Sequence, residues 1–335
     1  MIESFWNKLP HPFFVLAPMA DVTDAAFRRI VAKYGKPDVM WTEFVACDGL
    51  QSVGREHLMR DLSYSEEERP IVAQVFGSKP ENFKATAELI RELGFDGIDI
   101  NMGCPENNIV KQGAGAYLIN TPEIAKEIIT ATKEGAGDMP VSIKTRIGYN
   151  KNELETWIPF LLETDISALT IHTRTRKEMS DVPARWEHIK RTVEIRNEMK
   201  SKTLIIGNGD IKNIEEGKAR VKETGCDGIM IGRGVFGNPW LFADRKDTPS
   251  FEEKCAVLLE HAKLFEEMYT EKLPFDSCDS LRACPSTRLG TKNFSILKKH
   301  FKSYVTGFDG AKELRVALME TENAEEVRKI LENRK

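Results

Sequence analysis

Eight short apolar or β-branched runs, about 25 to 45 residues apart, constrain this 335-residue chain more than any other feature. Helical patterns with recognisable ends separate the runs, as where Asn213 and Glu216 open a helix that Gly225 closes. Strands that alternate with helices predict a parallel sheet of the α/β class, and eight of them favour a (β/α)8 TIM barrel over an open doubly wound sheet. The predicted strands are 13–18, 39–44, 71–76, 97–102, 141–147, 168–174, 203–208 and 228–233.

An internal repeat supports the closed barrel. Residues 92–103 (ELGFDGIDINMG) match residues 223–234 (ETGCDGIMIGRG) with a constant offset of 131, so the fourth strand resembles the eighth. The alternative is that both segments merely share the residues that stop a helix, form a turn and begin a strand.

The last part of the chain has a different pattern. A polar linker at 243–250 is followed by helical spacing at 251–269, 291–304, 311–319 and 324–333. We therefore expect a catalytic barrel over residues 1–243 and a small all-α domain over residues 251–335.

Composition excludes several classes of protein. The longest apolar run, 13–20, contains Pro18 and is far shorter than the roughly 18 residues that span a bilayer, so we expect no membrane association. The first twelve residues lack the features of a signal peptide, which favours a cytoplasmic protein. Six cysteines without a CxxC pair argue against a zinc site and a disulfide framework, so we expect no metal.

The predicted strands end in polar residues, and in a TIM barrel the active site lies at the face where the strands end. These ends include Thr42-Glu43, Gln74, Asp99 with Asn101, Lys144 with Arg146, and His172 with Arg174. Any one of them can be a satisfied core group or a loop cap, but eight such strand ends together indicate a functional face.

The loops after the seventh and eighth strands predict a phosphate pocket. Gly207–Ile211 and Ile231–Gly234 carry glycines that let backbone N–H groups approach an anion, and Arg233 adds a guanidinium. Tight turns explain the glycines equally well. A single phosphate site without a GxGxxG or Walker motif indicates a mononucleotide such as FMN. Lys144 then suits the N1–C2=O edge of the flavin ring, and Gln74 its pyrimidine side.

Cys104 follows the fourth strand and is the candidate catalytic residue. A thiol with an ordinary pKa near 8.5 is protonated at neutral pH, so it can donate a proton to a forming carbanion. The alternative is a small apolar side chain that fills a turn.

Residues 282–304 contain six basic residues and no acidic one, although the whole chain has a net charge of −4. Such a stretch is typical of contacts to an RNA backbone, whereas its aromatic residues fit the core of the helical domain better. Four of its cations are candidate tRNA contacts: Arg288, Lys292, Lys298 and Lys299.

Six motifs together resemble the tRNA-dihydrouridine synthases, from about residue 13 to residue 242. They are LAPMADVTD (16–24), AQVFGS (73–78), DINMGCP (99–105), IKTRIG (143–148), IHTR (171–174) and GIMIGR (228–233). The resemblance implies an FMN-dependent barrel that reduces uridines of tRNA with NADPH, followed by a helical domain that helps to hold the tRNA.

The resemblance also implies roles for individual residues. Cys104 would be the proton donor, Asn101 would contact the target uracil, and we expect Arg174 and Arg176 to grip the flipped nucleotide or its phosphate. FMN would be held by Pro18, Met19, Ala20, Gln74, Lys144, His172, Asn208, Gly209, Asp210, Gly232 and Arg233. Residues 177–181 (KEMSD) depart from the Gln and Tyr or Phe that are common in the family, which puts substrate contacts from this loop in doubt.

Two other interpretations stay open at this point. One is an FMN barrel that acts on a free pyrimidine or another small molecule, and the other is a non-catalytic RNA chaperone. The modified uridine, the preference for NADPH over NADH and the oligomeric state do not follow from the sequence.

Overall fold

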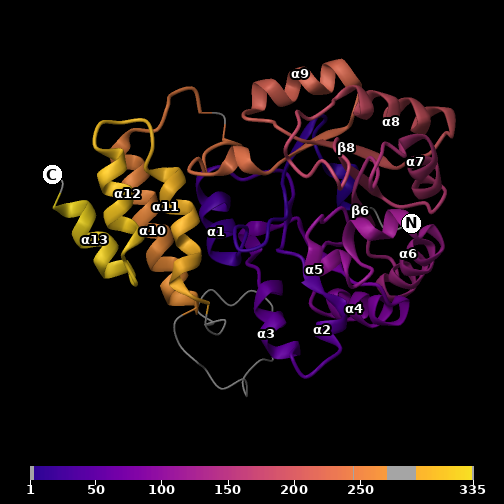
Figure 1. The fold of residues 1–335 in the computed structure, drawn as a ribbon, viewed down its shortest axis with the longest axis horizontal. Coiled ribbons are helices and arrows are strands. Elements are labelled where there is room, and N and C mark those ends of the chain that lie inside the picture. Colours follow the sequence, from indigo (N-terminus) through magenta and orange to yellow (C-terminus); the bar gives the residue numbers. More distant parts are fainter. Residues whose placement is uncertain (1–3, 244, 270–291, 334–335) are drawn as a thin grey trace.

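Eight parallel strands form a nearly closed barrel, which occupies the right-hand part of Figure 1. The computed structural model describes residues 4–243, 245–269 and 292–333. Strands pair in the order β1-β9-β8-β7-β6-β5-β4-β2, and a parallel bridge between Val15 and Val39 brings the two ends together. The barrel strands are β1 (Phe13–Leu16), β2 (Met40–Trp41), β4 (Ile71–Phe76), β5 (Gly97–Met102), β6 (Val141–Arg146), β7 (Ala168–His172), β8 (Leu204–Asn208) and β9 (Gly228–Ile231). The eight predicted runs and the predicted barrel are confirmed.

Helices cover the outside of the barrel between successive strands. They are α1 (Ala25–Tyr34), α4 (Pro80–Glu92), α6 (Pro122–Ala136), α7 (Leu154–Leu162), α8 (Glu187–Glu198) and α9 (Ile214–Thr224). As predicted, Asn213 Oδ1 caps α9 by accepting from Glu216 N (2.8 Å), and Gly225 ends it with a φ of 73°. A short strand, β3 (Val45–Ala46), and three short helices lie in the loops: α2 (Cys47–Leu50), α3 (Arg55–Met59) and α5 (Asn107–Val110).

The pleat of β1 shows how the core is divided. Phe13 and Val15 face the barrel interior, where they pack with Trp6 and Met230 in one cluster. Phe14 and Leu16 point the other way into the cluster between barrel and helices. Because side chains alternate along a strand, each strand serves both cores, and the last inward residues border the active-site face.

In the described residues four α-helices follow the barrel, on the left of Figure 1, and α10 contacts α1. They are α10 (Phe251–Tyr269), α11 (Lys298–Tyr304), α12 (Ala311–Met319) and α13 (Ala324–Glu332). We call residues 251–269 and 292–333 the helical tail. Its apolar cluster includes Phe301 and Tyr304 as well as Ala26 and Ile30 of α1. The aromatic residues of the basic stretch are therefore core residues. Within the described residues, no helix is both long and apolar enough to cross a bilayer.

Candidate active site

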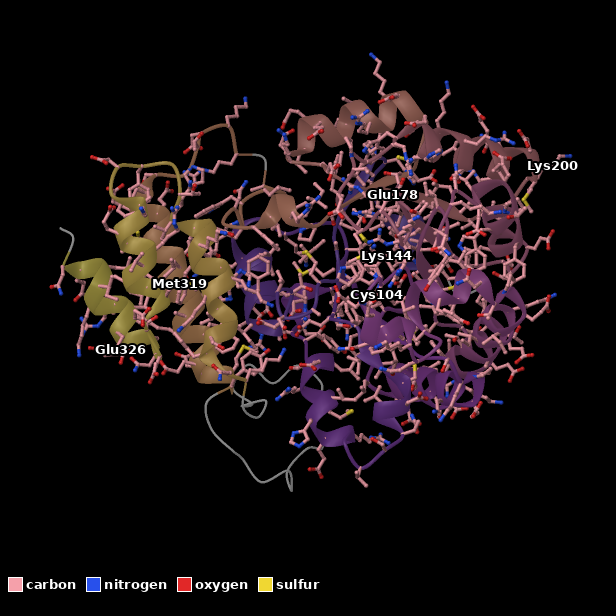
Figure 2. All side chains as sticks on the ribbon, in the orientation of Figure 1. Cys104, Lys144, Glu178, Lys200, Met319 and Glu326 are labelled. Carbon is pink, nitrogen blue, oxygen red and sulfur yellow. The ribbon has the colours of Figure 1, made fainter. Side chains whose placement is uncertain are left out.

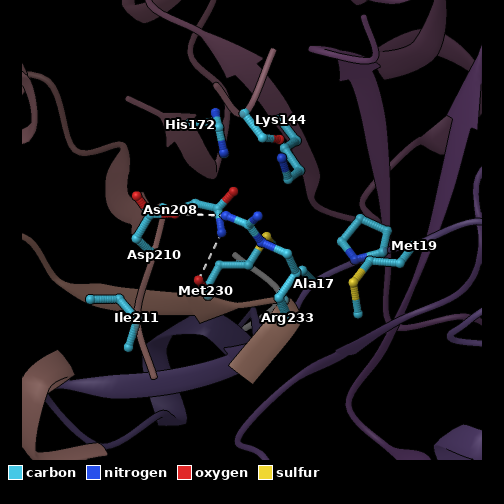
Figure 3. A pocket seen from close by; sticks show the side chains of 13 residues that line it. Ala17, Met19, Lys144, His172, Asn208, Asp210, Ile211, Met230 and Arg233 are labelled. Carbon is cyan, nitrogen blue, oxygen red and sulfur yellow. Dashed lines mark hydrogen bonds and ion pairs between the residues drawn. The ribbon is translucent and has the colours of Figure 1, made fainter. Parts of the chain in front are cut away.

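A pocket opens where β1, β6, β7, β8 and β9 end (Figure 3). The strands are parallel, so their carboxyl ends lie at one face of the barrel and bring residues far apart in the sequence together. Nine of the eleven residues expected to hold a cofactor line this pocket: Pro18, Met19, Lys144, His172, Asn208, Gly209, Asp210, Gly232 and Arg233. Ala20 and Gln74 are not among its lining residues.

Positive charge and one unpaired nitrogen characterise the pocket. Burial, followed by the charge of Arg146, lowers the pKa of Lys144 to about 8. Burial and the nearby cations, Lys144 first, hold the pKa of His172 well below its ordinary value, so the imidazole is neutral at pH 7. His172 Nδ1 is buried and has no hydrogen-bond partner among the described residues. A polar, negatively charged group would satisfy both this nitrogen and the cations.

The glycine loops form the other side of the pocket. Gly209 has a φ of 139°, and a Cβ atom there would lie 2.8 Å from the Cβ of Ala184, so this position requires glycine. Within the described part of the chain, no acceptor meets the backbone N–H groups of Gly232 and Arg233. Arg233 Nη2 donates to Asp210 Oδ1 (2.7 Å), which aims the guanidinium at the pocket from the side opposite Lys144 and His172 (Figure 3). This donor set fits the phosphate of a mononucleotide.

Asn101 supports the loop that carries Cys104. Its Oδ1 accepts from the backbone N–H groups of Cys104 (2.9 Å) and Gly103 (3.1 Å), and its Nδ2 donates to Gln74 Oε1 (3.0 Å). Gln74 in turn donates from Nε2 to Asp99 Oδ2 (2.6 Å) and is fully buried. Burial raises the pKa of Asp99 to about 6. Gln74 therefore belongs to a polar layer beneath the site rather than to the pocket wall.

The Cys104 thiol lies in apolar surroundings near Lys144 (Figure 2). The side chain is 9% exposed and packs with Ile109, Ala114, Phe44 and Phe76. Burial raises the pKa of Cys104, so the thiol carries its proton at pH 7. A protonated thiol at the end of β5 can serve as an acid but is a poor nucleophile.

Arg146 joins two loops of the site. The sequence places it among the polar strand ends, but no role was predicted for it. Its Nε donates to the carbonyl of Gly103 (2.7 Å), and its Nη1 donates to the carbonyls of Met179 (2.9 Å) and Thr175 (3.1 Å). Burial lowers the pKa of Arg146 to about 10, so it remains a cation at neutral pH. Ser180 and Met230 also line the pocket, although no role was predicted for either, and Ile211 lines it as part of the predicted 207–211 loop. Ser180 lies in the 177–181 loop, where nothing in the sequence identified it.

The structure corrects the expectation for Arg174. Its side chain is 2% exposed, and its guanidinium donates to the carbonyl of Val182 (2.5 Å) and to Asp210. The arginine thus supports the pocket from behind and is not placed to grip a substrate. Arg176 is half-buried and donates to Asn107 Oδ1 (2.6 Å) and to the carbonyl of Pro105 (3.3 Å).

Lys292 also differs from the expectation of an RNA contact. Its side chain is 4% exposed, and its ammonium contacts Glu43 (2.6 Å) and Asp61 (2.9 Å). Burial alone lowers the pKa of a lysine, but these two carboxylates raise the pKa of Lys292 above its ordinary value. A buried, doubly paired cation cannot meet a phosphate.

The other predicted RNA contacts have different positions. Lys299 is exposed and contacts Asp21 (3.3 Å), and Lys298 is half-buried on the same helix, α11. Arg288 lies outside the described residues.

Comparisons with known proteins agree with this architecture. A family model described as dihydrouridine synthase (Dus) matches residues 15–335. A probable tRNA-dihydrouridine synthase of Staphylococcus aureus (strain COL) is 42% identical over 334 residues, which cover 99% of this chain and 96% of that protein. Probable tRNA-dihydrouridine synthase 2 of Bacillus subtilis (strain 168) is 42% identical over 335 residues, which cover 99% of this chain and 97% of that protein.

Solved structures share the fold at low identity. Morphinone reductase superposes with a TM-score of 0.51 at 13% identity, over 70% of this chain and 86% of that one. Histamine dehydrogenase from Rhizobium sp. 4-9 gives a TM-score of 0.51 at 13% identity, over 75% of this chain and 48% of that one. At 13% identity these two likenesses show a shared fold and nothing more. The family model and the two relatives span almost the whole sequence, and on that ground this chain belongs to the dihydrouridine synthase family.

Proposed function

We propose that this protein reduces specific uridines of tRNA to 5,6-dihydrouridine, with FMN as its cofactor and NADPH as the reductant. One observation carries the proposal beyond family membership. A cationic pocket suited to a mononucleotide phosphate lies at the same barrel face as a buried, protonated thiol. A flavin and an acid at one face are what the reduction of a uracil double bond needs.

The residues present fit FMN. Backbone N–H groups of Gly232 and Arg233, with the Arg233 guanidinium, would hold the phosphate, and His172 Nδ1 would gain a partner. Lys144 would meet the edge of the ring where negative charge gathers on reduction. Pro18, Met19, Ala20, Asn208, Gly209 and Asp210 would complete the contacts, and Gln74 would contribute indirectly by accepting from Asn101 in the layer beneath the pocket. When bound, FMN supplies the hydride that NADPH provides and that uracil C6 receives.

Cys104 supplies the proton. As negative charge builds on C5 and the C4 carbonyl of the uracil, the thiol donates its proton to C5 and becomes a thiolate. The cations of Arg146 and Lys144 lie close enough to stabilise that thiolate electrostatically until solvent returns the proton.

Asn101 has one donor left for the substrate. An amide NH₂ group carries two N–H donors, and Asn101 gives one of them to Gln74. The other N–H can meet a carbonyl oxygen of the uracil, while Oδ1 keeps the Cys104 loop in place. Asn101 would thus align the base and its proton donor with a single side chain.

The helical tail is proposed to hold the tRNA. The target uridine must leave its stack to reach the barrel, which costs a few kcal/mol and is cheapest in a strained loop. Lys298, Lys299 and Arg288 would contact the RNA backbone, whereas Lys292 is committed to the barrel. In this division residues 1–243 bind FMN and catalyse the reaction, and residues 251–335 bind tRNA.

Nucleotide-resolution mass mapping of tRNA from a strain that lacks this gene tests the proposal. Defined positions that carry dihydrouridine in the wild type should carry unmodified uridine, lighter by two hydrogen atoms, and the wild-type gene should restore dihydrouridine. Unchanged tRNA would favour the reductase of a free pyrimidine. A colourless protein that FMN cannot reconstitute would favour the non-catalytic RNA chaperone.

A further inference from the structure

We propose that Tyr117, Tyr149 and Arg176 form a stacking platform for an unpaired tRNA base next to the target uridine. The inference rests on the proposed function and adds a substrate contact that the cofactor pocket and Cys104 do not explain. We call these three side chains the rim platform.

Three different loops build the rim platform at the active-site face. Tyr117 follows β5 in a short 3-10 helix (Gly115–Asn120), Tyr149 follows β6, and Arg176 follows β7. The two tyrosine rings meet edge to face with centroids 6.0 Å apart. The Arg176 guanidinium carbon lies 5.4 Å from the centroid of the Tyr149 ring.

Backbone hydrogen bonds fix two of these loops to each other. Arg176 N donates to the carbonyl of Gly148 (2.9 Å), and Lys177 N donates to the carbonyl of Tyr149 (2.9 Å). The guanidinium is held further by Asn107 Oδ1 (2.6 Å). A side chain anchored at both ends loses little conformational entropy when a ligand stacks on it.

The platform adjoins the proton donor. Ala116 N, next to Tyr117, donates to the carbonyl of Cys104 (3.0 Å). Arg176 Nε donates to the carbonyl of Pro105, the residue after Cys104 (3.3 Å). A uracil placed against the Cys104 thiol would therefore have its neighbouring nucleotide within reach of the platform.

Exposure and charge indicate a nucleobase rather than a core role. Tyr117 is 37% exposed, although a tyrosine of the barrel core would be buried. Arg176 and the exposed Lys177 bring positive charge beside the rings. Single-stranded RNA is recognised by aromatic and guanidinium planes together with backbone cations. When the uridine leaves its stack, the next base loses a stacking partner, and the platform can replace it.

Tyr117→Ala tests the platform, with Tyr117→Phe as the variant that keeps the ring. One base–aromatic stack is worth at least about 1 kcal/mol, so Tyr117→Ala should raise the KM for tRNA about fivefold or more. Tyr117→Phe should keep the wild-type KM, and flavin reduction by NADPH without tRNA should be unchanged in both variants. Ile124→Ala, at a 36% exposed position on α6, is the matched control and should leave KM unchanged.

A second measurement reads stacking directly. 2-Aminopurine placed in the tRNA beside the target uridine should be quenched on binding to wild-type protein and to Tyr117→Phe, but not to Tyr117→Ala. If Tyr117→Ala keeps KM within twofold and still quenches the probe, the platform is wrong while the proposed function stands. If wild-type protein forms no dihydrouridine from tRNA, the proposed function and the platform both fail.

Discussion

The ammonium of Lys292 lies 2.6 Å from Oε2 of Glu43, and this contact joins the helical tail to the active-site face of the barrel. Glu43 follows β2, and its other oxygen accepts from the backbone N–H of Asp21 (2.5 Å). Asp21 belongs to the loop after β1 that also carries the pocket residue Met19. The Glu43 carboxylate thus binds both the helical tail, through Lys292, and the pocket loop, through Asp21.

Removing the cation of this pair should destabilise the protein strongly. Lys292→Met leaves Glu43, which is 7% exposed, and Asp61 without their buried partner. Breaking a buried pair from one side costs about 3–5 kcal/mol, which urea unfolding can measure. Lys299→Met removes only an exposed pair with Asp21 and should cost less than about 1 kcal/mol. If both variants lose the same small amount of unfolding free energy, the ion pair of Lys292 is not what fixes the helical tail.

Lys299 should matter for RNA binding instead. The side chain is 52% exposed, so a phosphate can reach it. Lys299→Met should weaken tRNA binding and reduce the slope of log Kd against log salt by about 1, as expected for one lost phosphate contact. Lys202→Met is the control, because that exposed lysine precedes β8 and lies at the opposite end of the barrel. A salt slope that stays at the wild-type value would remove Lys299 from the interface.

Lys144 should make cofactor binding depend on pH. With its pKa lowered to about 8, Lys144 is charged below that pH and neutral above it. The affinity of the apoprotein for FMN should therefore fall as pH rises through about 8, by up to about tenfold per unit. Flavin fluorescence titrations between pH 7 and 9 would measure this. Lys144→Met should bind FMN more weakly at pH 7, and its affinity should not show this fall as pH rises through about 8. Parallel pH profiles of the two proteins would argue against a role for the ammonium.

Most of the residues that line the pocket could be grouped from the sequence because they occupy strand ends. Once the alternation of strands and helices indicates a barrel, topology places Lys144, His172, Asn208 and Arg233 at one face, whatever the loops do. Asn213 and Gly225 were equally predictable, because the rules for helix ends are local.

The partners of buried cations were not predictable. Lys292 lies in an acid-free stretch, so its sequence neighbours indicate a solvent-facing RNA contact, yet its carboxylate partners are Glu43 and Asp61, more than 200 positions away. Arg174 likewise pairs with Asp210, which is 36 positions distant. Both errors have the same cause, since local sequence reports charge but not which distant carboxylate it will be buried against. The contact between Tyr117 and Tyr149 was not predictable either, because it depends on the conformations of two separate loops.

The central claim is that Cys104 protonates a tRNA uridine that receives hydride at the flavin pocket. It is tested most directly by reducing the FMN-loaded protein with NADPH under anaerobic conditions, adding unmodified tRNA and measuring dihydrouridine by mass. Wild-type protein should form dihydrouridine. Cys104→Ala should accept electrons from NADPH at the wild-type rate but form dihydrouridine at least about 100-fold more slowly, because it lacks the general acid. Formation of dihydrouridine by Cys104→Ala at the wild-type rate, or none by the wild-type protein, would contradict the account.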